Sequence, residues 1–363
     1  MKDVTYLTKN YDKKIEHIKS LNADVNFLFI TDVHSGLNRQ SSQNSKYRSP
    51  EDFELSENAI EAMRYVAERC DIDFALCGGD VGNDYAPTPE GVKEAIGNFY
   101  EKLYSLPVPV HCCVGNHDDA VGWSTEIGRT VKYYAISPEA MHSLCMRNNP
   151  TDENYYFFDH EKSGLRFIIL NIADHPYIPD ENGNYTHGWG VDFSEKQLLW
   201  LDNEALNTDK SCIILCHMPV LCKGVFGCCG YPYGFREKND FPRGDEIMKC
   251  IKKHGNVCMW LAGHVHADNL RYGDGDLEGV VTVTTDGSFL DPQMQPIPER
   301  IFGEVSETVF DVFSIKDNYM YITRFGAGLD RQAVLCHTKK VLPMQMVWRK
   351  QIRDNEFAMQ NDK

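Results

Sequence analysis

Five short motifs along the chain carry side chains that bind metal ions. In order, they are Asp32-Val33-His34, Gly79-Asp80, Asn116-His117-Asp118, Cys216-His217 and His264-Val265-His266. Carboxylates, imidazoles and amide oxygens suit hard and borderline divalent cations, whereas copper(I) and iron–sulfur clusters need softer ligands such as thiolates. In an extended chain, residues i and i+2 lie on the same side, so the D-x-H and H-x-H spacings predict paired ligands to a common centre on a regular backbone.

Each motif taken singly has a simpler explanation. A lone H-x-H is commonly a pair of structural or surface histidines, and N-H-D is a plausible turn or helix cap. The joint pattern favours a metal site, because every motif directly follows a short apolar run of the kind that forms a buried strand. These runs cover residues 25–30, 73–77, 108–114, 211–216 and 257–261, and a sixth covers 166–172.

Helical patterns alternate with the apolar runs, at residues 56–69, 88–104, 194–206 and 244–254. Ser194 and Gln197 have the S-x-x-Q spacing of a capping box. Strands alternating with helices predict an α/β domain with a mainly parallel centre, crossover helices on both faces, and an active site at the strand carboxyl ends. After about residue 280 the chain is β-rich, and Lys316-Asp317-Asn318 predicts a hairpin turn.

The ordered motifs resemble those of the calcineurin-like metallophosphoesterases, which read D-x-H, G-D-x-x-[DN], G-N-H-[DE], H and G-H-x-H. Here they read TDVH, GGDVGN, GNHD, CHMP and GHVH, between Asp32 and His266. The resemblance implies an α/β fold, namely a four-layered α/β/β/α sandwich with central mixed sheets. We interpret residues 1–363 as a single domain of this kind, with a β-rich extension of the sheet at about 280–330.

The resemblance also implies a set of metal ligands. One metal would be held by Asp32, His34 and His266, and a second by Asn116, His217 and His264, with Asp80 bridging the two. At the position of Asn83 the purple acid phosphatases of this superfamily have a tyrosine that binds the metal. Because this chain has asparagine there, the resemblance predicts a protein without the tyrosinate colour.

Two residues are implied to contact the substrate. His117 falls where the family contacts the phosphate and protonates the leaving oxygen, and Asn116 lies beside it as a second substrate-binding residue. Asp118 is a candidate to orient or tune the His117 imidazole, and a turn role is the alternative.

These residues predict an enzyme, a dinuclear metallophosphoesterase acting on phosphomonoesters or phosphodiesters. Two divalent cations, drawn from Mn, Fe, Zn, Ni or Mg, would activate a bridging hydroxide and clamp the phosphate oxygens. The alternatives are a nuclease or cyclic-nucleotide phosphodiesterase of the same superfamily, and a non-catalytic scaffold, which the complete ligand set disfavours. A net charge of −16 without a basic cluster repels nucleic acid, so we expect a small phosphate ester as partner.

The composition is that of an ordinary folded protein. The first twenty residues have no apolar signal segment and no later stretch could span a membrane, so we expect a cytoplasmic protein without a membrane partner. We interpret the 13 cysteines as mostly reduced, buried side chains. The spacing of Cys222, Cys228 and Cys229 disfavours structural zinc, and residues 221–241 are predicted to form a loop over the site. Residues 38–50 and 173–189 are candidate pocket walls or plain surface loops.

Overall fold

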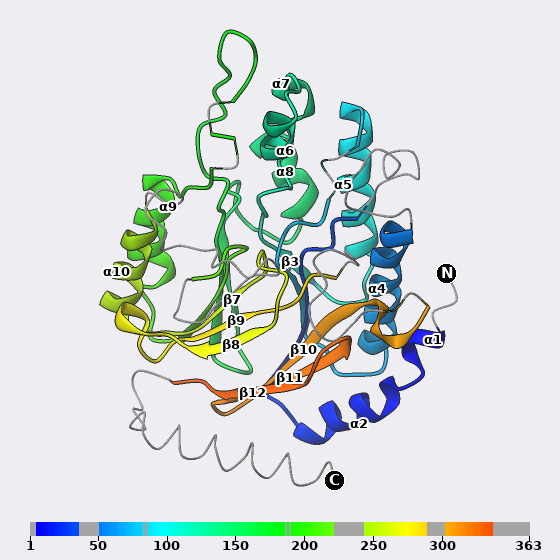
Figure 1. Ribbon diagram of the computed structural model, residues 1–363. Coiled ribbons are helices and arrows are strands. Elements are labelled where there is room, and N and C mark those ends of the chain that lie inside the picture. Colours follow the sequence, from blue (N-terminus) through cyan, green and yellow to red (C-terminus); the bar gives the residue numbers. More distant parts are fainter. Residues whose placement is uncertain are drawn as a thin grey trace.

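Two mixed six-stranded sheets form the centre of the molecule, and helices cover their outer surfaces (Figure 1). The computed structural model describes residues 5–35, 51–82, 84, 86–185, 187–188, 190–220, 243–288, 301 and 303–336, with 51–57 as backbone alone. The layers follow the order helix, sheet, sheet, helix (Figure 1). The expected fold class, an α/β/β/α sandwich with central mixed sheets, is confirmed.

The first sheet has the strand order β12-β11-β10-β1-β2-β3. Three parallel strands, β1 (Val25–Ile30), β2 (Phe74–Cys77) and β3 (Val110–Cys112), lie side by side. The C-terminal strands β10 (Val309–Lys316), β11 (Tyr319–Gly326) and β12 (Arg331–Val334) extend it in antiparallel fashion from β1. Lys316 pairs with Tyr319, so the predicted hairpin turn is confirmed.

The second sheet has the order β4-β5-β6-β7-β9-β8. Its central strands β5 (Leu165–Ile169), β6 (Ser211–Leu215), β7 (Val257–Ala262) and β9 (Val281–Thr284) are parallel. The edge strands β4 (Tyr156–His160) and β8 (Asn269–Tyr272) are antiparallel to their neighbours. Neither edge strand was predicted from the sequence, because both are short and mix apolar with charged residues.

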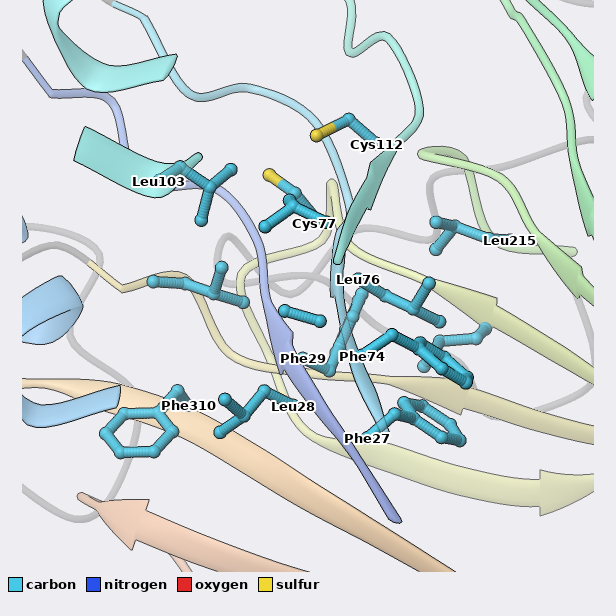
Figure 2. Packing of buried hydrophobic residues seen from close by; sticks show 14 of the residues in the cluster. Phe27, Leu28, Phe29, Phe74, Leu76, Cys77, Leu103, Cys112, Leu215 and Phe310 are labelled. Carbon is cyan, nitrogen blue, oxygen red and sulfur yellow. The ribbon is translucent and has the colours of Figure 1, made fainter. Parts of the chain in front are cut away.

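Aromatic rings join the inner faces of the two sheets. Phe27 of β1 and Phe74 of β2 stack at 5.4 Å between ring centroids (Figure 2). Both meet Phe167 of the second sheet edge-on, at 5.5 and 4.9 Å respectively. Such pairs add to the free energy gained from apolar burial. The seam between the sheets is therefore made by every second residue of the central strands.

The intervening residues face the helices. Phe310 of β10 contacts Tyr11 of helix α2 (Tyr11–Leu21), with ring centroids 6.1 Å apart. In the second sheet, Ile168, Ile214 and Trp260 share a buried cluster with residues of α9 (Glu195–Trp200) and α10 (Gly244–His254). Helices thus cover one face of each sheet, and the prediction of helices on both faces of one sheet is wrong. The physical reason is that the other face of each sheet is apolar and is buried by its partner sheet.

The predicted helices are present, with caps at two of the predicted starts. Helix α4 covers Glu51–Ala67, α5 covers Pro89–Leu103, and α9 continues as a π-helical turn over Leu201–Ala205. Thr88 Oγ1 accepts a hydrogen bond from Gly91 N at 3.1 Å, and Ser194 Oγ accepts one from Gln197 N at 3.0 Å. Each hydroxyl satisfies a backbone donor that the first helical turn leaves unpaired.

Several short helices were not predicted. They are α1 (Thr5–Thr8), α2, α6 (Val121–Glu126), α7 (Val131–Tyr134), α8 (Pro138–Cys145) and the 3₁₀ turns Gly275–Leu277 and Val305–Glu307. Within the described residues, no helix combines the length and apolar character needed to cross a membrane. Eight of the ten cysteines in the described residues are buried, in keeping with their interpretation as small apolar side chains.

The aromatic seam predicts a large effect of one truncation. Phe74→Ala leaves a cavity between the sheets, and we expect the free energy of unfolding in urea to fall by about 3–5 kcal/mol. Tyr133→Ala is the matched control, because this ring is 58% exposed, and its effect should stay near 0.5 kcal/mol. Equal losses for the two variants would contradict the role of the seam.

Candidate metal centre

The predicted ligands come together where the two sheets meet. The motifs follow β1, β2 and β3 in the first sheet and β6 and β7 in the second. Within each sheet these strands are parallel, so their carboxyl ends lie at one edge. The candidate donors form three overlapping groups, and within each group the donor atoms lie within 4.8 Å of one another. The groups are Asp32/His34/His266, His34/Asp80/His117 and Asp80/His217/His264.

Asp32, His34 and His266 form the first donor group. Nε2 of His266 lies 3.1 Å from Oδ1 of Asp32 and 3.4 Å from Nε2 of His34. The other carboxylate oxygen, Oδ2, accepts hydrogen bonds from Thr31 Oγ1 at 2.7 Å and from the His264 amide at 2.9 Å. Those bonds orient the Asp32 carboxylate, so that Oδ1 faces the imidazoles.

Asp80 connects this group with a second one. Its Oδ2 lies 3.2 Å from Nε2 of His217 and 3.9 Å from Nε2 of His34. Asn116 Oδ1 lies 3.0 Å from the same His217 nitrogen. On the far side of the ring, His217 Nδ1 lies 2.7 Å from the carbonyl oxygen of Gly78, which orients the imidazole with Nε2 toward the carboxylate.

The backbone that carries the candidate ligands is not a regular extended segment, so the prediction of paired ligands on a regular backbone is wrong in that respect. Among the described residues, eight non-glycine residues have positive φ, and five are motif residues: Asp32 (50°), His34 (46°), Asp80 (52°), His264 (65°) and His266 (46°). A left-handed backbone is strained for such residues and persists where the surrounding structure enforces it. The paired candidate ligands converge because the chain coils sharply beyond the strand ends.

Close packing of the loops depends on two glycines. A Cβ atom at Gly115 would lie 2.1 Å from Asp80 Oδ1, and one at Gly263 would lie 2.0 Å from Thr31 Oγ1 and 2.2 Å from Asp32 Oδ2. Any side chain at these positions would push a motif carboxylate out of place. Both glycines belong to the motifs that the sequence singled out.

Burial and mutual charge set the ionisation of these donors. Burial opposes the charge of Asp32 and Asp80, yet the neighbouring imidazoles hold the pKa of both carboxyls below the ordinary range. Burial also opposes the charge of His217, but Asp80 and Asp32 outweigh it and raise its pKa to about 10. Burial and the charge of His217 lower the pKa of His264 to about 3. The oxygen and imidazole donors fit divalent cations, which compete with protons for such atoms.

His117 pairs with an acid that the sequence reasoning missed. Its Nδ1 lies 3.1 and 3.2 Å from the two carboxylate oxygens of Asp84, which is fully buried. The His117 amide also donates to Asp80 Oδ1 at 2.9 Å, which positions the residue beside the donor groups. Asp84 lies four residues after Asp80, and no spacing rule in the sequence distinguished it from a loop residue.

Of the two roles predicted for Asp118, orienting His117 or stabilising a turn, the hydrogen bonds of its carboxylate fit the turn role. Its Oδ2 accepts hydrogen bonds from the amides of Gly115 and Asp80 at 2.7 and 3.0 Å. Its Oδ1 accepts a bond from Val81 at 2.9 Å and a longer one from Gly82. The carboxylate therefore ties the loop after β2 to the loop after β3, and Asp84 makes the imidazole contact expected of Asp118.

Of the predicted pocket walls, residues 173–189 can be placed in part. Tyr177 of this segment donates a hydrogen bond to Asp119 Oδ2 at 2.7 Å, so the segment meets the loop that carries His117. Asn83 and the segments 38–50 and 221–241 lie outside the described residues.

The chain matches one family model and aligns with solved structures. Residues 25–268 match the family model for calcineurin-like phosphoesterases, and no curated protein matches the chain in sequence. A dimetal phosphatase from Danio rerio is similar in structure over 86% of this chain and 100% of its own, with 17% identity and a TM-score of 0.56. A calcineurin-like phosphoesterase from Bacillus subtilis aligns over 91% of this chain and 97% of its own, with 12% identity and a TM-score of 0.38. At 17% identity, the similarity to the Danio rerio protein shows a shared fold and does not by itself show a shared function.

The backbone bonds of Asp118 predict a structural defect on substitution. Asp118→Asn turns an amide NH₂ toward backbone N–H donors, so we expect the free energy of unfolding, measured in urea with EDTA present, to fall by about 2–5 kcal/mol. Asp209→Asn, at an exposed position, is the control and should change it by less than about 0.5 kcal/mol. A stability equal to that of the wild type would show that these bonds do not hold the loops.

Proposed function

Because the chain belongs to the calcineurin-like phosphoesterase family, we propose that it hydrolyses phosphate esters with two divalent cations. One observation carries this proposal. Asp80 Oδ2 faces His217 on one side, at 3.2 Å, and His34 on the other, at 3.9 Å. A carboxylate that faces two donor groups in this way is suited to bridge two cations.

The donors divide into two sets around Asp80. Asp32, His34 and His266 would hold one cation, and Asn116, His217 and His264 would hold the other. When bound, two such cations supply the positive charge that lowers the pKa of a water molecule and neutralises phosphate oxygens. The oxygen and imidazole donors suit Mn, Fe, Zn, Ni or Mg.

His117 and Asp84 would supply the proton for the leaving oxygen. Asp84 accepts the Nδ1 proton of His117, so it orients the ring and favours the imidazolium form. The opposite ring nitrogen, Nε2, would then donate a proton to the departing alkoxide or phenoxide. The bond from the His117 amide to Asp80 fixes the distance between this acid and the cation donors.

The substrate is proposed to be a small phosphate ester, either a monoester or a diester. A nuclease or cyclic-nucleotide phosphodiesterase of the same family is the second candidate, and the net charge of −16 counts against binding a long polyanion. A scaffold without activity is disfavoured, since seven potential ligands and His117 are all retained and meet at one place.

The proposed activity predicts metal-dependent turnover of simple phosphate esters. Protein stripped with a chelator should not hydrolyse p-nitrophenyl phosphate, bis(p-nitrophenyl) phosphate or p-nitrophenyl phenylphosphonate. Supplying manganese, zinc, nickel or magnesium should restore hydrolysis of at least one ester, and the ratio of monoester to diester turnover identifies the substrate class. Asp80→Asn is the control and should lose this activity, because the shared ligand is weakened. No turnover with any metal, despite two bound ions, would contradict the proposal.

The pairing of His117 with Asp84 predicts two distinct defects. His117→Asn should lower kcat by about 10²- to 10⁴-fold while both ions stay bound, because a general acid is removed. Asp84→Asn should lower kcat less and move the alkaline limb of the pH–rate profile to lower pH, since the imidazolium loses its stabilising carboxylate.

The exposed His17 provides the matched control for this pair, since His17→Asn should leave both the rate and the pH profile unchanged. A normal kcat for His117→Asn would remove His117 from the mechanism. An unshifted profile for Asp84→Asn would reduce Asp84 to a packing role.

A further inference from the structure

A second cluster of metal-binding side chains lies outside the dinuclear site. Asp119, His175 and His187 each offer one donor atom, and the three atoms lie within 4.8 Å of one another. Asp119 belongs to the loop after β3, whereas both histidines belong to the segment between β5 and α9. None of the three is among the ligands of the dinuclear site, so the cluster needs its own explanation.

The carboxylate of Asp119 is already oriented by its neighbours. Its Oδ1 accepts a hydrogen bond from the Val121 amide at 2.9 Å, and its Oδ2 accepts one from Tyr177 Oη at 2.7 Å. His187 Nε2 lies 3.9 Å from the same Oδ2. Hydrogen bonds that fix a carboxylate beside an imidazole are typical of the residues around a bound metal ion.

The two imidazoles face each other with unsatisfied nitrogens. Their ring centroids are 3.8 Å apart. His175 Nδ1 and His187 Nε2 are both buried, and neither has a hydrogen-bond partner among the described residues. Most buried polar atoms in native proteins have a partner. An unpartnered His187 Nε2 beside the Asp119 carboxylate, and a second unpartnered nitrogen on the neighbouring His175 ring, therefore call for an explanation such as an ion.

We propose that Asp119, His175 and His187 bind a third divalent cation, of the borderline class to which Zn²⁺ belongs. Two imidazoles and one carboxylate are a common protein ligand set for such ions, with a further position open to water. Ligand atoms around tetrahedral zinc lie about 3.3 Å apart, so the 3.9 Å between His187 and Asp119 closes with a small shift. Tyr177 then serves as the outer donor that holds the carboxylate.

The alternative is that the rings stack as a plain aromatic cluster. Tyr177 does stack on His175, with centroids 5.1 Å apart. Stacking alone leaves both buried nitrogens without a partner, which is unfavourable for each of them. It also does not explain why both imidazoles lie close to the buried carboxylate of Asp119.

A cation at this cluster would fasten two loops together. Asp119 comes two residues after His117, and the backbone contact between Lys132 N and Gly183 O, at 3.0 Å, joins the same segment to α7. The segment 173–190 would then be held against the loop that carries His117. This role is independent of the chemistry proposed for the dinuclear site.

The test is a count of bound Zn²⁺ per chain by inductively coupled plasma mass spectrometry, on full-length protein stripped with EDTA and reloaded with zinc. His187→Gln and His175→Gln should each bind one equivalent fewer than the wild type, whereas the exposed His17→Gln should bind the same number. The same difference of one equivalent is expected in an Asp80→Asn background. The difference is therefore a readout that does not depend on whether the dinuclear site fills.

Reloading with Co²⁺ gives a second readout, because His187→Gln should lose part of the visible ligand-field absorption. Circular dichroism in EDTA shows whether each variant is folded. If His187→Gln and His175→Gln are both unfolded, His187→Cys keeps a metal-binding side chain. In Co²⁺-loaded His187→Cys we expect a thiolate-to-cobalt charge-transfer band that the Co²⁺-loaded wild type lacks, and a folded variant without this band overturns the proposal. Wild-type zinc content in folded His187→Gln and His175→Gln overturns it equally, whatever the outcome of the phosphatase assays.

Discussion

The carboxylate of Asp80 is buried where the two sheets meet, and contacts from several loops stabilise it there. An isolated buried carboxylate is strongly unfavourable, and it is tolerated when it is paired and hydrogen-bonded. Asp80 Oδ1 accepts the His117 amide, Oδ2 faces the His217 ring, and the Asp80 amide donates to Asp118. Through this one residue the loop after β2 is joined to the loops after β3 and β6.

A second buried charge fixes the loop after β7. The guanidinium of Arg324 in β11 is fully buried and contacts Asp311 of β10 at 2.7 Å and Asp268 at 2.6 Å. Burial opposes the charge of Asp311, but Arg324 and Arg331 outweigh it and keep its pKa below the ordinary range. Asp268 comes two residues after His266, so the C-terminal hairpin of the first sheet holds the end of a loop that belongs to the second sheet. The late β-rich segment therefore supports the site as well as extending a sheet.

The strained backbone and the close packing of the loops both serve to hold the donor side chains at one place. Five motif residues have left-handed φ values, and a Cβ atom at Gly115 or Gly263 would collide with a motif carboxylate. These conformations lie directly beyond strands whose side chains are fully buried, such as β1 and β7. The buried core thus supports the strained residues, and the donor atoms are held close to the strand ends.

The sequence by itself determined the residues that could bind metal, their order, and the strand before each one. These features are local. An apolar run followed by a polar turn indicates a strand and a loop whatever the rest of the fold is, and Ser194 placed before Gln197 likewise indicates the start of a helix. The strand patterns did not determine that two sheets pack face to face, because an apolar strand face does not say what covers it, and the expectation of a sandwich came from the family resemblance alone. Nor could the sequence show that Asp84, and not Asp118, meets His117, or that Asp119 meets His175 and His187. Those pairings depend on which loops the tertiary structure brings together, and on which way a carboxylate turns once the backbone donors around it are in place.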